Sequence, residues 1–76
     1  MEILLRPEAV KRLAALQNKT FRELAHDAGM HETYLHRLMR HEHEPSARIR
    51  RRMCERWGVT FEEIFTIRGE VADDAS

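Results

Sequence analysis

The stretch Phe21–Arg40 (FRELAHDAGMHETYLHRLMR) constrains the fold most strongly, because its pattern is that of two short helices separated by one glycine. Thr20 and Glu23 stand three positions apart, just before the apolar residues of the first helix. This is the spacing of a capping box, in which the threonine hydroxyl accepts from the Glu23 amide and the carboxylate reaches back. Gly29 can take the left-handed conformation that a tight reversal between helices needs. We therefore expect helices from Phe21 to about Asp27 and from about Glu32 to Met39.

The second of these helices divides into two faces when its residues are placed at intervals of about 100°. One arc is apolar and suits a protein core: Tyr34, Leu35, Leu38 and Met39. The other arc carries hydrogen-bonding groups and should face outward: Glu32, Thr33, His36, Arg37 and Arg40. Such a face is either a solvated surface or a recognition surface.

These features, taken in order, resemble the helix-turn-helix of the Cro and phage-repressor (XRE) family. The resemblance rests on the cap, Leu24-Ala25, the turn residue Gly29, and apolar residues at Met30, Leu35 and Leu38. It continues into Pro45-Ser46 and Trp57-Gly58-Val59, and covers roughly residues 8 to 66. It implies an all-α fold: a compact bundle of five short helices of the lambda-repressor-like type, with the motif formed by helices 2 and 3. It also implies that helix 3 enters the major groove of DNA.

The rest of the chain should supply three further helices. The first runs from Pro7 to about Asn18, the fourth from Pro45-Ser46 to a stop at Gly58, and the fifth starts at a second capping box, Thr60 and Glu63. The expected core combines their apolar residues with those of the motif: Leu13, Leu24, Ala25, Leu35, Leu38, Ile49, Met53 and Trp57. The apolar run Ile3–Leu5 either covers this core, which we favour, or forms an arm that meets a partner chain. His41 stands where relatives usually have the glycine that ends helix 3, which suggests a different ending for that helix.

Length and charge point to one small intracellular domain. The chain has 76 residues, which we divide into a helix-turn-helix domain at 1–68 and an acidic tail at 69–76 that should be frayed or disordered. Its net charge is zero, but residues 1–57 hold 12 Lys or Arg against 8 Asp or Glu, and residues 58–76 hold 1 against 5. Cys54 is the only cysteine, so an internal disulfide is excluded, in agreement with a reducing cytosol. No apolar run is long enough to span a membrane and the start is not a signal peptide, so we expect a cytoplasmic protein.

The outward arc of helix 3 is the candidate base-reading face. Side chains near the start of such a helix can read the major groove: Glu32, Thr33, His36 and Arg37. Arg37 can make two bonds to guanine, Glu32 can accept from cytosine, and Thr33 can contact thymine. Many relatives have glutamine at the position of Phe21, where it contacts a phosphate and braces helix 3, whereas Phe21 should pack instead.

Basic side chains around this face are candidate phosphate contacts: Arg22, Arg40, His41, Arg48 and Arg51. Four arginines at 48 and 50–52 open helix 4, where they are unfavourable with the helix dipole, and phosphates would offset that cost. A solvated face paired with nearby glutamates is an equally good interpretation of this cluster. The expected dimer interface consists of apolar residues near the C-terminus: Phe61, Phe65 and Ile67.

The remaining side-chain patterns give little support to catalysis or metal binding. Histidines recur at 26, 31, 36 and 41, and a five-residue step turns successive rings away from one another on a helix. No nucleophile elbow, phosphate loop or paired carboxylate pattern is present. We therefore expect no enzyme, cofactor or metal, and predict a sequence-specific regulator that binds double-stranded DNA as a homodimer on a two-fold operator. A repressor of phage, mobile-element or restriction-modification type fits the small size. The alternative is an antitoxin-like module with a protein partner, suggested by the acidic tail, for which DNA binding is secondary.

Overall fold

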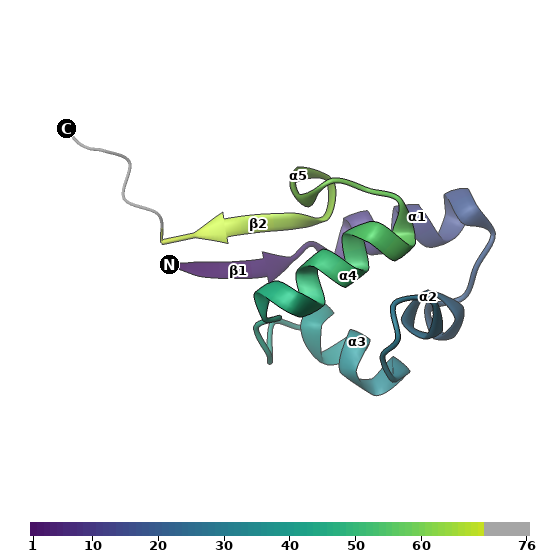
Figure 1. Ribbon diagram of the computed structural model, residues 1–76, viewed down its shortest axis with the longest axis horizontal. Helices are drawn as coiled ribbons and strands as arrows, with labels where there is room; N and C mark the ends of the chain where they lie inside the picture. The colour runs from purple at the N-terminus through teal and green to yellow at the C-terminus, as the bar shows by residue number, and fades with distance from the viewer. Residues whose placement is uncertain (70–76) are drawn as a thin grey trace.

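Five helices follow one another between two short strands in the computed structural model, which describes residues 1–69 (Figure 1). In chain order the elements are β1 (Glu2–Leu5), α1 (Pro7–Gln17), α2 (Phe21–Asp27), α3 (Glu32–Met39), α4 (Ala47–Trp57), α5 (Phe61–Ile64) and β2 (Phe65–Arg68). The ranges expected for α2 and α3 agree with the structure, and α1 ends one residue earlier than expected. Except for Gly69, the predicted tail lies outside the described residues.

The two strands show that the prediction of an all-α fold is wrong. β1 and β2 pair antiparallel, with Glu2 opposite Arg68 and Leu5 opposite Phe65. The fifth helix stops after one turn because Phe65 takes an extended conformation, with φ −119° and ψ 156°. The β-branched residues Thr66 and Ile67 then favour a strand. The apolar run that opens the chain covers the core, as we favoured, since Leu4 and Leu5 are buried.

The core lies where α1, α2, α3 and α4 converge, and it is closed at one side by the strands and α5. Of the expected core residues, Ile49 is only partly buried and the others are buried. The structure adds a second group that the expected core did not include: Val10, Ile64 and Phe65. The indole N–H of Trp57 donates to the Leu24 carbonyl oxygen across 2.8 Å, which fixes α4 against α2. The first element of the motif is therefore anchored from outside the motif.

The end of α3 differs from the sequence expectation. His41 adopts the left-handed conformation itself, with φ 61°, so the helix ends as it would with glycine. The Glu42 amide donates to the Arg37 carbonyl (2.9 Å) and the His41 amide to the Leu38 carbonyl (3.1 Å), which is a Schellman motif. The His41 ring also donates from Nε2 to the Leu5 carbonyl oxygen across 2.8 Å. These bonds offset the conformational cost of a left-handed residue that has a side chain.

Candidate nucleic-acid interface

The turn between α2 and α3 is built by local hydrogen bonds around Gly29. Thr20 and Glu23 form the expected capping box, with the Glu23 amide donating to the Thr20 hydroxyl across 3.1 Å. At the other end of α2, the Gly29 amide donates to the His26 carbonyl (2.9 Å) and the Met30 amide to the Ala25 carbonyl (2.9 Å). Gly29 has φ 71°, so it provides the left-handed residue of this Schellman motif. The two helices are thus joined by a short reversal that backbone hydrogen bonds stabilise.

Arg52 of α4 holds this turn from outside. Its guanidinium Nη1 donates to the Gly29 carbonyl oxygen across 3.4 Å. A Cβ at position 29 would lie 3.0 Å from the same nitrogen, so the arginine lies directly over the glycine. Sequence reasoning did not assign Arg52 a site role, although its spacing of four from Arg48 places both on one side of the helix. The structure therefore adds Arg52 as a positioning residue for the α2–α3 turn.

The outward face of α3 carries all four predicted base-reading residues, of which two are bonded to each other and two have exposed side chains. Glu32 and His36 bond to each other, with 3.2 Å between Glu32 Oε2 and His36 Nε2. The His36 ring also meets the edge of Phe21 at a centroid distance of 5.6 Å and an interplanar angle of 90°. By contrast, the side chains of Thr33 and Arg37 are exposed and make no hydrogen bond or ion pair within residues 1–69. Thr33 and Arg37 are therefore the two members of the set whose side chains have no partner within residues 1–69.

Phe21 has a bracing role that uses packing instead of a phosphate contact. Its half-buried ring is the first residue of α2 and packs against the core as well as against His36. Edge-to-face aromatic pairs at this distance contribute about 0.5–1.5 kcal/mol beyond the area they bury. The contact orients His36, and through His36 it also orients Glu32.

The predicted phosphate contacts of the motif itself are arranged unequally. Arg22 is exposed and lines a groove of about 240 Å³ with His31 and Glu32, so it lies beside the start of α3. Arg40 pairs with Glu42, with 2.9 Å between Nε and Oε2, and this partner lowers the pKa of the Glu42 carboxyl. Both side chains are more than half exposed, so a phosphate can compete with the pair. His41 is committed to the Leu5 carbonyl oxygen and is the least available of the set.

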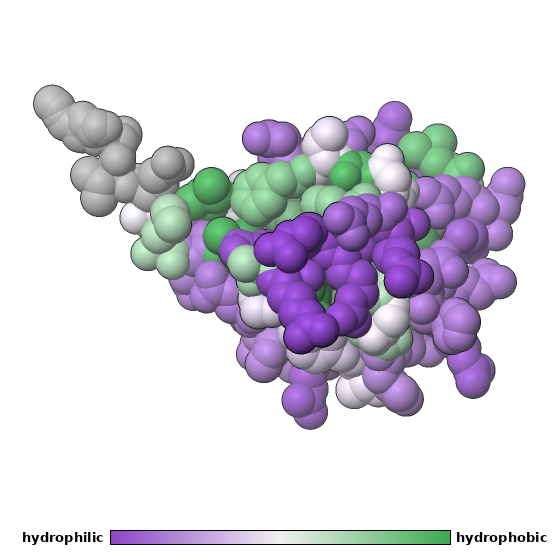
Figure 2. Space-filling model, in the orientation of Figure 1, coloured by the Kyte–Doolittle hydropathy of each residue, from purple (hydrophilic) through white to green (hydrophobic). Residues whose placement is uncertain are grey.

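The α4 arginines point in different directions. Figure 2 shows strongly hydrophilic surface over α4, where these side chains gather. Arg48 is exposed at the start of the helix. Arg51 lines an open groove of about 450 Å³ with Ile3 and Phe61, on the side of α4 away from the Gly29 turn. The structure therefore brings Arg52 to the motif and does not bring Arg51 there.

Four of the five histidines have a structural partner within residues 1–69. His31 caps α3, because its Nδ1 accepts from the Thr33 amide across 3.2 Å. His36 and His41 have the contacts given above, and the His43 ring packs on Tyr34 at 5.1 Å. Within residues 1–69 no three side chains of the types His, Cys, Asp and Glu come together as a metal site would need.

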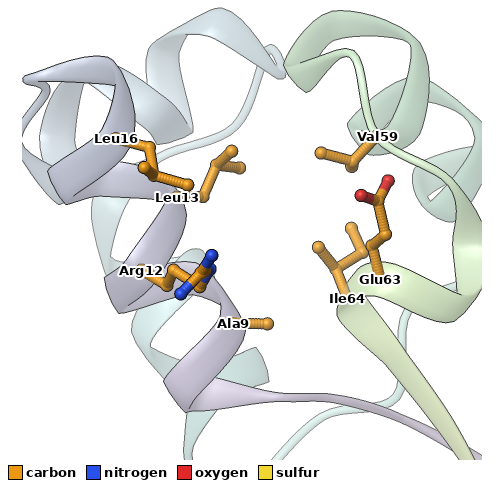
Figure 3. Close-up of a pocket in the computed structure, with 7 residues that line it drawn as sticks. All are labelled: Ala9, Arg12, Leu13, Leu16, Val59, Glu63 and Ile64. Carbon is orange, nitrogen blue, oxygen red and sulfur yellow. The ribbon is translucent and has the colours of Figure 1, made fainter.

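A third hollow lies between α1 and the segment that contains α5 (Figure 3). Its volume is about 170 Å³, below the range of about 300–1,000 Å³ usual for small-molecule sites. Ala9, Arg12, Leu13 and Leu16 form one wall, and Val59, Glu63 and Ile64 form the other. These residues include no nucleophile and only one carboxylate, so the hollow offers no acid–base pair.

The three residues predicted for a dimer interface are not equally accessible. Phe65 is 1% exposed and belongs to the core of its own chain. Phe61 is half-buried and packs on Phe65, with ring centroids 5.2 Å apart. Ile67 is 38% exposed on β2. Phe61 and Phe65 pack within their own chain, so Ile67 is the most accessible of the three to a partner.

Comparison of the chain with protein-family models, with curated proteins and with solved structures found no match. Within residues 1–69 no helix is both long enough and apolar enough to cross a membrane.

Proposed function

We propose that this chain is a sequence-specific regulator that binds double-stranded DNA with the outward face of α3. The observation that carries the proposal is that α3 presents an exposed polar face while hydrogen bonds fix its connection to α2. The capping box stabilises the start of α2, and the bonds around Gly29, including the one from Arg52, stabilise the turn between α2 and α3. Thr33 and Arg37 are exposed on the outward face of α3. An α-helix fits the major groove, where each base pair displays a distinct pattern of donors and acceptors.

In this proposal Arg37 and Thr33 make the primary base contacts. The hydrogen-bonded Glu32–His36 pair can contribute the acceptor of its carboxylate to a cytosine amino group without separating. Arg22, beside the start of α3, and Arg48, at the start of α4, are the phosphate contacts that fit best. Arg40 joins them once a phosphate displaces Glu42.

The direct test is selection of bound sequences from a random duplex library, followed by salt titrations of each variant on the selected and a scrambled duplex. Arg37→Ala should cost about 1–3 kcal/mol on the selected duplex and relax the preference at one base position. Arg48→Ala should weaken both duplexes alike and lower the salt slope by about one. The symmetry and spacing of the selected half-sites test the homodimer on a two-fold operator, with about 34 Å between half-sites, that the sequence predicts.

Lys11→Ala on α1 is the matched control, because this exposed cation lies on a helix outside the motif. It should leave both affinities and the sequence preference unchanged. If Arg37→Ala lowers both affinities equally and keeps the preference, α3 does not read bases through Arg37. If no sequence is enriched from the library, the proposal of sequence-specific binding is wrong.

A second candidate is an interaction module whose main partner is another protein. The observation that favours it is exposed apolar surface outside the motif, where Leu16 is 66% exposed and Ile67 is 38% exposed. Figure 2 shows hydrophobic surface along the strands and α5. Native mass spectrometry of the protein purified from its source cell separates the two candidates, since a stoichiometric unrelated chain favours the second.

A further inference from the structure

We propose that two copies of this chain pair along the outer edge of β2, antiparallel and centred on Ile67, to form a four-stranded sheet. A two-stranded sheet has two outer edges, and each exposes backbone groups that can template another strand. The inference deepens the homodimer part of the proposed function, but it rests on the backbone of the strands and not on DNA binding.

The register decides which backbone groups face outward. The Arg6 amide donates to the Ile64 carbonyl oxygen across 2.8 Å, just beyond the paired residues Leu5 and Phe65. Because hydrogen-bonded and non-hydrogen-bonded pairs alternate in an antiparallel ladder, the pair of Ile3 and Ile67 does not exchange backbone bonds. The amides and carbonyls of this pair therefore point away from the ladder, toward the two outer edges.

The outer edge of β1 is closed by the loop between α3 and α4. The Ile3 amide donates to the Glu44 carboxylate across 3.0 Å, and His41 Nε2 donates to the Leu5 carbonyl oxygen across 2.8 Å. Two side chains from one loop thus occupy outward-facing groups along this strand. No further strand can pair with β1 without displacing both.

The outer edge of β2 is closed at one end and open at the other. The Phe65 amide donates to the Phe61 carbonyl, and the Phe65 carbonyl oxygen accepts from Arg6 Nε across 3.2 Å. Within residues 1–69 the Ile67 amide and carbonyl have no such partner. The Ile67 side chain is also one of the exposed large apolar residues. β2 is short and ends in the charged Arg68, but it contains no proline or bulge that would block pairing at Ile67.

A second copy fits this edge because the edge is self-complementary. With a two-fold axis at Ile67, each Ile67 amide meets the carbonyl of the other copy, and the two isoleucine side chains lie side by side. Thr66 then lies opposite Arg68 of the other copy. The alternative register, centred on Arg68, would place two arginines directly opposite each other, which is unfavourable. Arg68 already pairs with Glu2 of its own chain, with 2.9 Å between Nε and Oε1, so the chosen register brings no unpaired like charges together.

The position of the edge leaves the candidate DNA-binding face free. In Figure 1, β1 lies between β2 and the α3–α4 loop, so the outer edge of β2 faces away from α3. Pairing along β2 therefore covers neither copy of α3.

Sedimentation velocity of the full chain without DNA, over a wide range of concentration, tests the pairing independently of the proposed function. The wild type should show a reversible monomer–dimer equilibrium. Ile67→Pro removes the outward amide but no bond to β1, since proline is tolerated where the amide of an edge strand faces solvent. It should raise the dimer dissociation constant at least about tenfold, with an unchanged circular dichroism spectrum. Leu16→Lys is the control, because Leu16 is an exposed apolar residue on α1, and it should leave the equilibrium unchanged.

Disulfide trapping tests the register. In the background Cys54→Ser, Ile67→Cys should form a covalent dimer under mild oxidation, because directly opposite hydrogen-bonded residues have Cα atoms about 5.5 Å apart, within disulfide range. Thr66→Cys should cross-link far more slowly, because Thr66 would lie opposite Arg68. A monomeric wild type at every concentration overturns the proposal. So does a dimer that survives Ile67→Pro, dissociates with Leu16→Lys, or cross-links faster through position 66.

Discussion

The substitution Gly29→Ala measures how strongly Arg52 holds the turn between α2 and α3. Gly29 and Gly58 are both left-handed, with φ 71° and φ 69°, and both follow the end of a helix. An alanine at Gly58 meets nothing within 4 Å, whereas an alanine at Gly29 places its Cβ 3.0 Å from Arg52 Nη1. The two substitutions share the same backbone cost and differ in one side-chain contact, so Gly58→Ala is a matched control.

The expected magnitudes follow from these two terms. A left-handed residue with a side chain costs about 1–2 kcal/mol, which is the whole expected effect of Gly58→Ala. Gly29→Ala must also displace the guanidinium and lose its bond to the Gly29 carbonyl, which adds about 0.5–1.5 kcal/mol. Its total is therefore about 1.5–3.5 kcal/mol. In an Arg52→Ala background the extra term disappears, and Gly29→Ala should cost no more than Gly58→Ala.

Urea unfolding of the four variants and the wild type, followed by circular dichroism, gives these free energies from the midpoints if the slopes agree. A difference of about 1 kcal/mol corresponds to about 4–8 °C in Tm for a domain of this size, so thermal unfolding is an independent check. The reasoning is refuted if Gly29→Ala and Gly58→Ala cost the same when Arg52 is present. It is also refuted if the cost of Gly29→Ala does not fall when Arg52 is removed.

Three further predictions follow from the charges and from the free thiol. Because Arg40 lowers the pKa of the Glu42 carboxyl, the Arg40–Glu42 pair is intact at neutral pH. Glu42→Gln should release Arg40 and raise DNA affinity about threefold at low salt. A lower affinity, measured by fluorescence anisotropy, would contradict this. Burial, and to a smaller extent the nearby carboxylates, raise the pKa of the Cys54 thiol. Iodoacetamide should therefore react more slowly with the folded than with the urea-unfolded protein at neutral pH, and the rate for the folded protein should increase only at more alkaline pH. Equal rates for the two forms would refute this. Ending the chain after Arg68 removes three carboxylates of residues 69–76 and should raise affinity for random duplex at low salt, whereas unchanged binding in the same titration would exclude a role for the tail's charge.

Features that depend on neighbouring residues could be predicted from the sequence. The bounds of α2 and α3 were predicted correctly because a capping box spans four residues and a glycine reversal needs only the preceding turn. The two faces of α3 followed from helical periodicity alone, since Leu35 and Leu38 are buried and Arg37 is exposed.

Pairing between the two ends of the chain could not be predicted in this way. β1 and β2 have four residues each, too few to show a clear alternation, and Leu5 finds its partner Phe65 at the other end of the domain. The sequence pattern placed Phe65 in a fifth helix and at a dimer interface. The extended backbone at Phe65 instead turns its side chain into the core. The same pairing created the open edge at Ile67, which no local pattern indicates.

The sequence by itself determined the pattern of two helices joined at Gly29 and the polar composition of the face that α3 presents, because both depend on residues within one or two helical turns. Only the tertiary structure decided which of those side chains are free. His41 is held by the Leu5 carbonyl, and Arg52 is held over Gly29, through contacts between residues 36 and 23 positions apart. Whether a polar side chain has a partner depends on what the fold brings within about 3 Å of it, and residues that are distant in the chain supply those partners.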